Sequence, residues 1–143
     1  MASTRTVLFL CPHGAAKSVM AAAYCQQLAD ERHLPLIATL AGTDPDPDIA
    51  PGVVAGLRAE AIDVSDHRPR RVTSADVEST WRVVLLGCDL NELPLVPTPI
   101  AQWDEVPPAS QGFATTRAAI LAHLADFLDT AAVEIGGDPT TQR

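Results

Sequence analysis

A cysteine at position 11 and the loop that follows it form the part of this sequence best suited to chemistry. Cys11 ends the apolar run Val7–Leu10, a short loop of small residues follows, and Lys17-Ser18 opens a predicted helix. Such a loop directs backbone N–H groups and the positive end of a helix at whatever lies above it, and this arrangement binds anions. The positive end also lowers the pKa of a thiol beside it, and the thiolate is the nucleophilic form. The pattern therefore predicts a cysteine nucleophile next to an oxyanion site.

The side chains of the loop add to this expected chemistry. A helix terminus supplies roughly 0.3–2 kcal/mol of stabilisation to a neighbouring thiolate. We expect further stabilisation of the Cys11 thiolate from the loop N–H groups, the Ser18 hydroxyl and the Lys17 ammonium. His13 projects from the loop, where an imidazole can donate a proton, contact a substrate or simply be solvated. The residues expected to hold the oxyanion are Pro12, His13, Gly14, Ala15, Ala16 and Lys17.

The elements that must position this loop follow from an alternation of strand and helix patterns, which favours a parallel α/β sheet. Strands are predicted over 5–11, 36–40, 82–86 and 100–103, and helices over 18–32, 51–62, 74–80 and 115–133. Residues 1–135 are expected to form a single domain, followed by a disordered tail over 136–143. Because ligands bind beyond the carboxyl ends of parallel strands, the loop after the first strand lies where a site is expected.

The composition restricts the partners. The chain has 143 residues, 47% of them hydrophobic, and its net charge of −8 argues against nucleic acid or an anionic membrane surface as a partner. No apolar run approaches the ~20 residues of a membrane-spanning helix, and the apolar start is too short for a signal peptide. Three cysteines without a secretion signal indicate a reducing, cytoplasmic location. Neither a metal nor a resident cofactor is expected, because Cys-x-His is not a usual ligand spacing.

The order of motifs along the chain resembles the low-molecular-weight protein tyrosine phosphatases and their thioredoxin-coupled arsenate reductase relatives. The loop Cys11–Ser18 is similar to their C-x5-R-S motif, and further segments follow in the family's order: Met20–Ala23, Ala41–Thr43, Ala61–Val72, Val83–Asp89 with Leu93-Pro94, and Trp103-Asp104. The resemblance implies a three-layer α/β domain with a central four-stranded parallel sheet and helices on both faces. It also implies that Cys11 attacks phosphorus or arsenic in a small oxyanion or a phosphorylated substrate, with Ser18 stabilising the thiolate.

Three positions depart from the family's pattern. Lys17 stands where the family has arginine, and a lysine is a point charge that cannot make the two-pronged contact of a guanidinium. Gly14 replaces an asparagine that braces the loop in those enzymes. Pro107 falls where they carry a general-acid aspartate, and general acid catalysis typically raises the reaction rate about 10²–10⁴-fold. Asp104 or Glu105 is the candidate replacement for that acid.

The arsenate reductase branch requires further thiols, because the attacked cysteine must be freed by thiol–disulfide exchange. Cys88 follows the predicted strand over 82–86, so it is expected on the same rim of the sheet as Cys11 and is a candidate disulfide partner. Leu93 stands where the relatives carry another thiol, and Cys25 is expected to pack inside the first helix. An external thiol reductant is therefore expected if the enzyme is reductase-like.

The sequence also permits two interpretations other than a Cys11-dependent enzyme. A degenerate family member would bind an anion or a phosphorylated partner without turnover, as the lost arginine and lost acid suggest. A nucleotide-binding P-loop is disfavoured, because Cys11 and Ala16 stand where its glycines are required. The basic cluster His67–Arg71 is interpreted either as a solvated turn or as a surface that attracts an anionic substrate.

Overall fold

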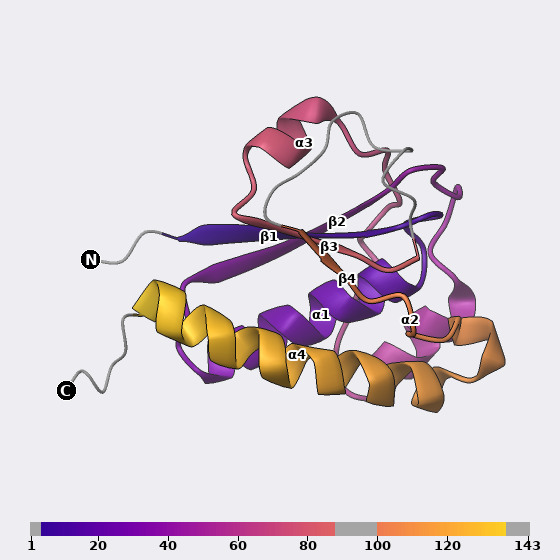
Figure 1. Cartoon of the computed structure of the whole chain (residues 1–143). Helices are drawn as coiled ribbons and strands as arrows, with labels where there is room; N and C mark the ends of the chain where they lie inside the picture. The colour runs from indigo at the N-terminus through magenta and orange to yellow at the C-terminus, as the bar shows by residue number, and fades with distance from the viewer. Residues whose placement is uncertain (1–3, 88–99, 137–143) are drawn as a thin grey trace.

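The computed structural model describes residues 4–87 and 100–136 and has a parallel sheet at its centre. Its strands lie in the order β2-β1-β3-β4, and each pairs in parallel with its neighbour. The strands are β1 (Arg5–Cys11), β2 (Leu36–Gly42), β3 (Arg82–Leu85) and β4 (Ile100–Gln102). The helices are α1 (Lys17–Glu31), α2 (Pro51–Arg58), α3 (Ser74–Glu78) and α4 (Phe113–Gly136), with a 3₁₀ turn, η2, at Ala109–Gln111. Figure 1 shows α3 above the sheet and the other three helices below it, which confirms the three-layer prediction.

Strand β1 is the central element of the core and contacts both layers. Val7, Phe9 and Cys11 belong to the large apolar cluster that includes α1, α2 and α4, whereas Leu8 and Leu10 belong to a smaller cluster with α3. A strand covered on both faces is apolar throughout, as the sequence of β1 is. Because side chains alternate between faces, the Cys11 side chain lies on the α1 side of the sheet.

Most predicted elements are present, and their ends differ by a few residues. Strand β2 continues two residues beyond the predicted Leu40, and α4 begins at Phe113 rather than Thr115. Helix α2 ends at Arg58 rather than near Ile62, because Ala61 takes a left-handed conformation (φ 65°) and the Ile62 N–H donates back to the Leu57 carbonyl. The chain is thereby turned four residues earlier than helical periodicity alone indicates.

Helix α4 packs along α1, as its predicted amphipathic pattern requires (Figure 1). Its buried positions recur at helical spacing: Ile120, Leu124, Leu128 and Ala131. The helix extends to Gly136, the first residue of the predicted tail, and 137–143 lie outside the described residues. Within 4–87 and 100–136, no helix is both long and apolar enough to cross a membrane.

Three polar side chains connect the middle of α1, the turn after α2 and the first turns of α4. The Tyr24 hydroxyl donates to Glu60 Oε2 at 2.7 Å, and the Arg117 guanidinium donates to both carboxylate oxygens of Glu60 at 2.9–3.1 Å. The hydrogen bonds from Arg117 and Tyr24 lower the pKa of Glu60. Burial and the hydrogen bond to Glu60 raise the pKa of Tyr24 to about 12.

Replacing Glu60 with glutamine is expected to lower the free energy of unfolding at pH 7 by about 1 kcal/mol, since both ionic partners are part-exposed. A carboxylate whose folded-state pKa is lowered stabilises the fold above its unfolded pKa of about 4.3 and loses that contribution as the pH falls. The parent and the variant are therefore expected to converge in stability toward pH 3 in urea-unfolding titrations. The exposed Glu31→Gln substitution is the matched control, and an equal effect there would contradict the assignment.

Candidate functional site

Cys11 and Ser18 meet where β1 ends and α1 begins. The Cys11 sulfur lies 3.1 Å from Ser18 Oγ, and the Ser18 backbone N–H donates to the same sulfur at 3.4 Å. Both side chains are buried. No side chain caps the N-terminus of α1, and no acidic residue lies in its first turn. The sulfur therefore lies at the positive end of an uncapped helix, as the sequence predicts.

The loop is held in shape by the segment that follows β2. Three of its carbonyls accept backbone hydrogen bonds, from Asp44 N to Pro12 O (2.7 Å), from Asp46 N to His13 O (3.0 Å) and from Ala50 N to Ala15 O (2.9 Å). In a trans peptide the C=O and the following N–H point in opposite directions. The N–H groups of His13, Gly14 and Ala16 are therefore directed away from that segment, and consecutive N–H groups of this kind can form an anion-binding nest.

Two glycines allow the loop and β2 to approach each other. Gly14 has a φ of 60°, a backbone conformation that residues other than glycine rarely adopt. A Cβ atom built on Gly42, the last residue of β2, would lie 2.7 Å from Gly14 N and 3.0 Å from His13 C. Both glycines belong to the motifs described above, but their contact is not visible in the sequence, because it joins the loop after β1 to the end of β2.

The basic cluster His67–Arg71 supports this same contact. The Arg70 carbonyl accepts from Gly42 N at 2.9 Å, and the Arg71 guanidinium donates to the Thr43 carbonyl at 2.7 Å. Arg70 also pairs with Asp76 at the start of α3. Two of the cluster's arginines therefore brace the chain beside the loop, a structural role that neither interpretation from the sequence included.

Lys17 extends along the rim of the sheet. Its Nζ lies 3.5 Å from the Val106 carbonyl, a long contact, and a Cβ atom built on Gly87 would lie 3.1 Å from it. Gly87 follows the end of β3, so the ammonium spans from the loop toward the next strand. Cys88, the predicted second thiol, follows Gly87 directly and lies outside the described residues.

A cavity of about 490 Å³ lies over the loop and has Cys11 among its lining residues. The loop residues Pro12, His13, Ala15, Ala16 and Lys17 also line it, so the structure gathers most of the predicted oxyanion-binding residues at one cavity. The remaining lining comes from two segments that the sequence gave no reason to expect: Asp46, Ala50, Gly52 and Val53 on one side, and Pro108, Ala109, Ser110 and Phe113 on the other. Most of this wall is apolar or small.

His13 lines the cavity, and one of its ring nitrogens lies close to two oxygen acceptors. Its Nδ1 lies 3.2 Å from the Asp44 carbonyl and 3.3 Å from Asp46 Oδ1. Asp46 was not singled out from the sequence, where it belongs to a proline-interrupted turn. The acidic candidates after β4 lie elsewhere: Asp104 is exposed and is not among the residues that line the cavity, and Glu105 pairs with His123 at 2.8 Å.

The other described cysteine differs sharply from Cys11. Cys25 is fully buried inside α1, and this burial raises its pKa to about 12. It is therefore a core residue, as expected. Among the described residues, no cluster of three or more histidines, cysteines, aspartates or glutamates is arranged to hold a metal ion.

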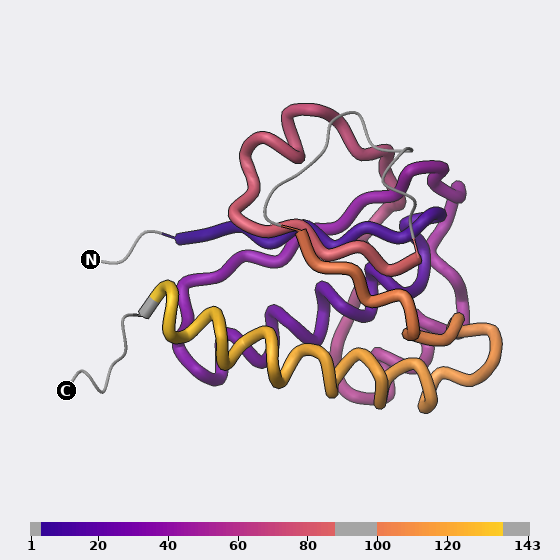
Figure 2. The backbone as a smooth tube through the Cα atoms, in the orientation of Figure 1, coloured from indigo at the N-terminus to yellow at the C-terminus, as the bar shows by residue number. Residues whose placement is uncertain are grey.

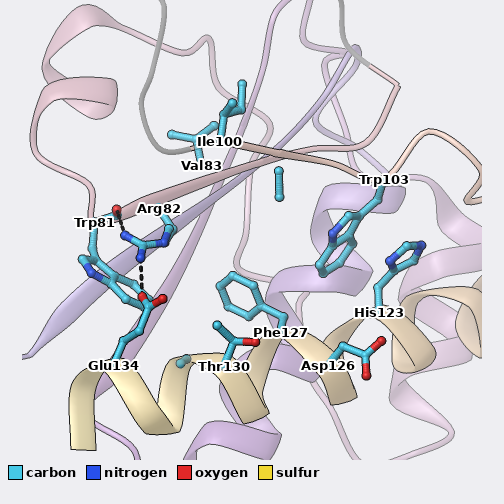
Figure 3. A pocket seen from close by; sticks show the side chains of 12 residues that line it. Trp81, Arg82, Val83, Ile100, Trp103, His123, Asp126, Phe127, Thr130 and Glu134 are labelled. Carbon is cyan, nitrogen blue, oxygen red and sulfur yellow. Dashed lines mark hydrogen bonds and ion pairs between the residues drawn. The ribbon is translucent and has the colours of Figure 1, made fainter. Parts of the chain in front are cut away.

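A second cavity, of about 300 Å³, lies between the β3–β4 edge and α4 (Figure 3). Three of its ionisable groups are in ion pairs: Arg82 pairs with Glu134, and His123 pairs with Glu105. Trp103 stacks on His123 with ring centroids 4.7 Å apart and an angle of 13° between the planes. Trp103 lies a few residues before the segment that contributes Val106 and Pro108–Ser110 to the site. Because His123 belongs to α4, this stacking anchors the start of that segment to α4.

Figure 2 shows where the site lies in the molecule. The loop after β1 and the segment before α4 meet on the right, whereas β1 begins and α4 ends on the left. A buried cysteine at the end of a central parallel strand, followed by a short loop and the start of a helix, defines an α/β protein with a thiol at the carboxyl edge of its sheet.

The family assignment agrees with this class. Residues 6–93 match the family described as low molecular weight phosphotyrosine protein phosphatase. Because the match covers more than half of the chain, this protein belongs to that family. The resemblance inferred from the motifs is thereby confirmed.

Individual relatives support the same fold. The chain is 28% identical over 103 residues to a putative arsenate reductase from Halobacterium salinarum, which covers 71% of this chain and 72% of the relative. YfkJ from Bacillus subtilis superposes with a TM-score of 0.81 at 21% identity, covering 92% of this chain and 97% of that one. A thioredoxin-dependent arsenate reductase from Corynebacterium glutamicum gives a TM-score of 0.77 at 22% identity, with 92% of this chain and 64% of that one covered.

Proposed function

We propose that this protein is a thiolate-dependent enzyme that cleaves a phosphate monoester, with Cys11 as the nucleophile. The observation that carries the proposal is the position of the Cys11 sulfur. It lines a cavity and contacts both the hydroxyl and the N–H of Ser18 at the start of α1. In the structure the thiol donates to the Ser18 hydroxyl, and an ionised Cys11 would instead accept from both Ser18 groups; the thiolate is the reactive form.

The reaction uses the loop as an oxyanion holder. The Cys11 thiolate attacks phosphorus, a P–S bond forms, and the ester P–O bond breaks. The N–H groups of His13, Gly14 and Ala16 hold the phosphoryl oxygens, where charge is concentrated in the transition state. Water then attacks the phosphocysteine, which releases phosphate and restores the thiolate. Lys17 adds positive charge from the rim without the two-pronged contact that an arginine makes.

The cavity favours an organic ester over a bare oxyanion. Its volume of about 490 Å³ extends well beyond the loop, between the start of α2 and the segment 108–113. Val53, Pro108 and Phe113 give it apolar walls. An apolar wall stabilises an apolar leaving group by removing its surface from water, which a free phosphate or arsenate ion does not need.

Arsenate reduction is the second candidate. It is supported by Gly87, which lies beside the Lys17 ammonium and directly precedes Cys88, and by the relative named as a putative arsenate reductase. In that reaction the Cys11 thiolate displaces water from arsenate, and a second thiol attacks the sulfur to form a disulfide and release arsenite. An external thiol then reduces the disulfide. The third candidate, a binder without turnover, would retain the anion and perform neither reaction.

The first test compares the reactivity of Cys11 and Cys25 toward iodoacetamide in a Cys88→Ser background. We expect the folded protein to be alkylated at Cys11 at pH 7, because the site stabilises its thiolate, whereas Cys25 is buried with a pKa of about 12. Inorganic phosphate is expected to slow the reaction at Cys11. Peptide mass spectrometry measures both sites, and the urea-unfolded protein is the control in which the two react alike.

Turnover assays then separate the three candidates. Hydrolysis of p-nitrophenyl phosphate supports the phosphatase, and arsenate-dependent thiol oxidation supports the reductase. Phosphate-protected alkylation without either turnover indicates the binder. Equal labelling of the two cysteines, unaffected by phosphate, would contradict an anion-binding thiolate site altogether.

A further inference from the structure

The proposed phosphatase reaction leaves one role unassigned: the departing ester oxygen needs a proton. Pro107 stands where the resembling enzymes carry their acid, Asp104 does not line the cavity, and Glu105 pairs with His123. Among the described residues, the titratable groups that do line the cavity are Cys11, His13, Lys17 and Asp46. Cys11 is the nucleophile, and the Lys17 ammonium extends toward the Val106 carbonyl.

The contacts of His13 engage one of its two ring nitrogens. Nδ1 lies between two oxygen atoms, the Asp44 carbonyl at 3.2 Å and the Asp46 carboxylate at 3.3 Å, so it carries a hydrogen. Nε2, on the other side of the ring, is then the nitrogen that gains and loses a proton. The backbone at His13 is fixed as well, since its carbonyl accepts from Asp46 N.

We propose that His13 is the general acid of this enzyme, with Asp46 as the residue that positions its ring. The inference rests on the proposed role of Cys11 and adds a catalytic residue that the departures from the family pattern had left without a candidate in the cavity. A histidine held by a carboxylate at one nitrogen and acting through the other is a general arrangement for proton transfer.

The proton balance of the step is complete. The thiolate forms the P–S bond while the ester P–O bond breaks, and the electron pair of the P–O bond passes to the leaving oxygen. That oxygen takes the proton from Nε2 of the imidazolium, and the alcohol departs. The neutral imidazole then removes a proton from the water that attacks the phosphocysteine, so that phosphate, thiolate and imidazolium are regenerated.

Several charged groups surround the ring. Asp44 and Asp46 lie in the segment after β2, and Cys11 and Lys17 line the same cavity from the loop and from α1. The substrate phosphate itself adds negative charge when bound. The Asp46→Asn substitution keeps an acceptor for Nδ1 and removes one of these charges, so it is expected to lower kcat/KM for phenyl phosphate less than His13→Asn does.

The test compares two aryl phosphates that differ in their need for a proton. Phenyl phosphate releases phenolate, a poor leaving group that needs a proton, whereas 2,4-dinitrophenyl phosphate releases 2,4-dinitrophenolate, which departs without protonation. For His13→Asn, kcat/KM is expected to fall on the order of 10²–10³-fold with phenyl phosphate. With 2,4-dinitrophenyl phosphate it is expected to change by less than about 5-fold, since only the acid step is lost. Asparagine keeps a donor near the position of Nδ1.

The matched control is His33→Asn, an exposed histidine just beyond the far end of α1. Its φ of 58° suits asparagine, and it is expected to hydrolyse both esters at the parent rate. Thermal unfolding checks that His13→Asn is folded. An equal loss for both esters, or none for either, would overturn the role of His13. If Cys11→Ser remains active, or the parent cleaves neither ester, the proposed function fails and the role of His13 fails with it.

Discussion

Replacing Cys11 with serine is expected to abolish turnover while leaving anion binding in place. Serine keeps nearly the same size and can still contact Ser18, but its hydroxyl is not ionised at neutral pH. Removing a nucleophile typically lowers kcat on the order of 10⁴-fold or more. The loop N–H groups that we propose hold the oxyanion belong to the backbone and are unchanged. Turnover of p-nitrophenyl phosphate and calorimetric binding of inorganic phosphate measure the two effects separately.

The matched control for this prediction is Cys25→Ser. Cys25 is buried in α1 and has no part in the site, so activity per folded molecule is expected to be retained. Stability is expected to fall by about 1–3 kcal/mol, because a hydroxyl is placed in an apolar environment. Retained turnover in Cys11→Ser, or its loss in a folded Cys25→Ser, would contradict a nucleophile at position 11.

Substituting Gly42 with alanine is expected to damage the site from a distance. The new Cβ would lie 2.7 Å from Gly14 N and 3.0 Å from Pro12 O, both backbone atoms, so the loop or the end of β2 must move. A displacement near 1 Å at a catalytic group can cost about 10²-fold in rate. Overpacking of this kind also lowers the free energy of unfolding by about 1–3 kcal/mol. Phosphate affinity, kcat/KM and urea unfolding measure these losses together.

Gly52→Ala is the stability control for that substitution. Gly52 lies in α2 with no atom within 4 Å of a Cβ built on it, so alanine there is expected to raise stability by about 0.5–1 kcal/mol. If Gly42→Ala were as stable as the parent and bound phosphate equally well, the contact between Gly42 and Gly14 would not be what shapes the loop.

The local part of the site was predictable because neighbouring residues determine it. An apolar run, a loop of small residues and a helix start place Cys11, Ser18 and the loop in one arrangement, and the structure has that arrangement. Cys11 and Ser18 are seven residues apart and depend on no distant segment. The same locality explains the accurate bounds of β1 and the buried face of α4, since a period of two or of 3.6 residues is visible in the sequence.

The distant part of the site was not predictable from local pattern. Asp46 reaches His13 only because the segment after β2 hydrogen-bonds to the loop, and nothing in its proline-rich surroundings indicates that partner. The wall residue Phe113 enters the cavity because α4 starts two residues early. The end of α2 depends on a left-handed alanine at 61, a conformation that alanine does not favour. Tertiary contacts determine all three.

The hydrogen bonds of the loop carbonyls have a consequence for how this protein can change over time. The hydrogen bonds that hold the loop come from main-chain groups, so the shape of the loop does not depend on the side chains at His13, Ala15 or Ala16. A new side chain at one of these positions would change the chemistry offered to the cavity while the backbone contacts stay in place. Directed evolution of new chemistry would therefore begin best at these positions.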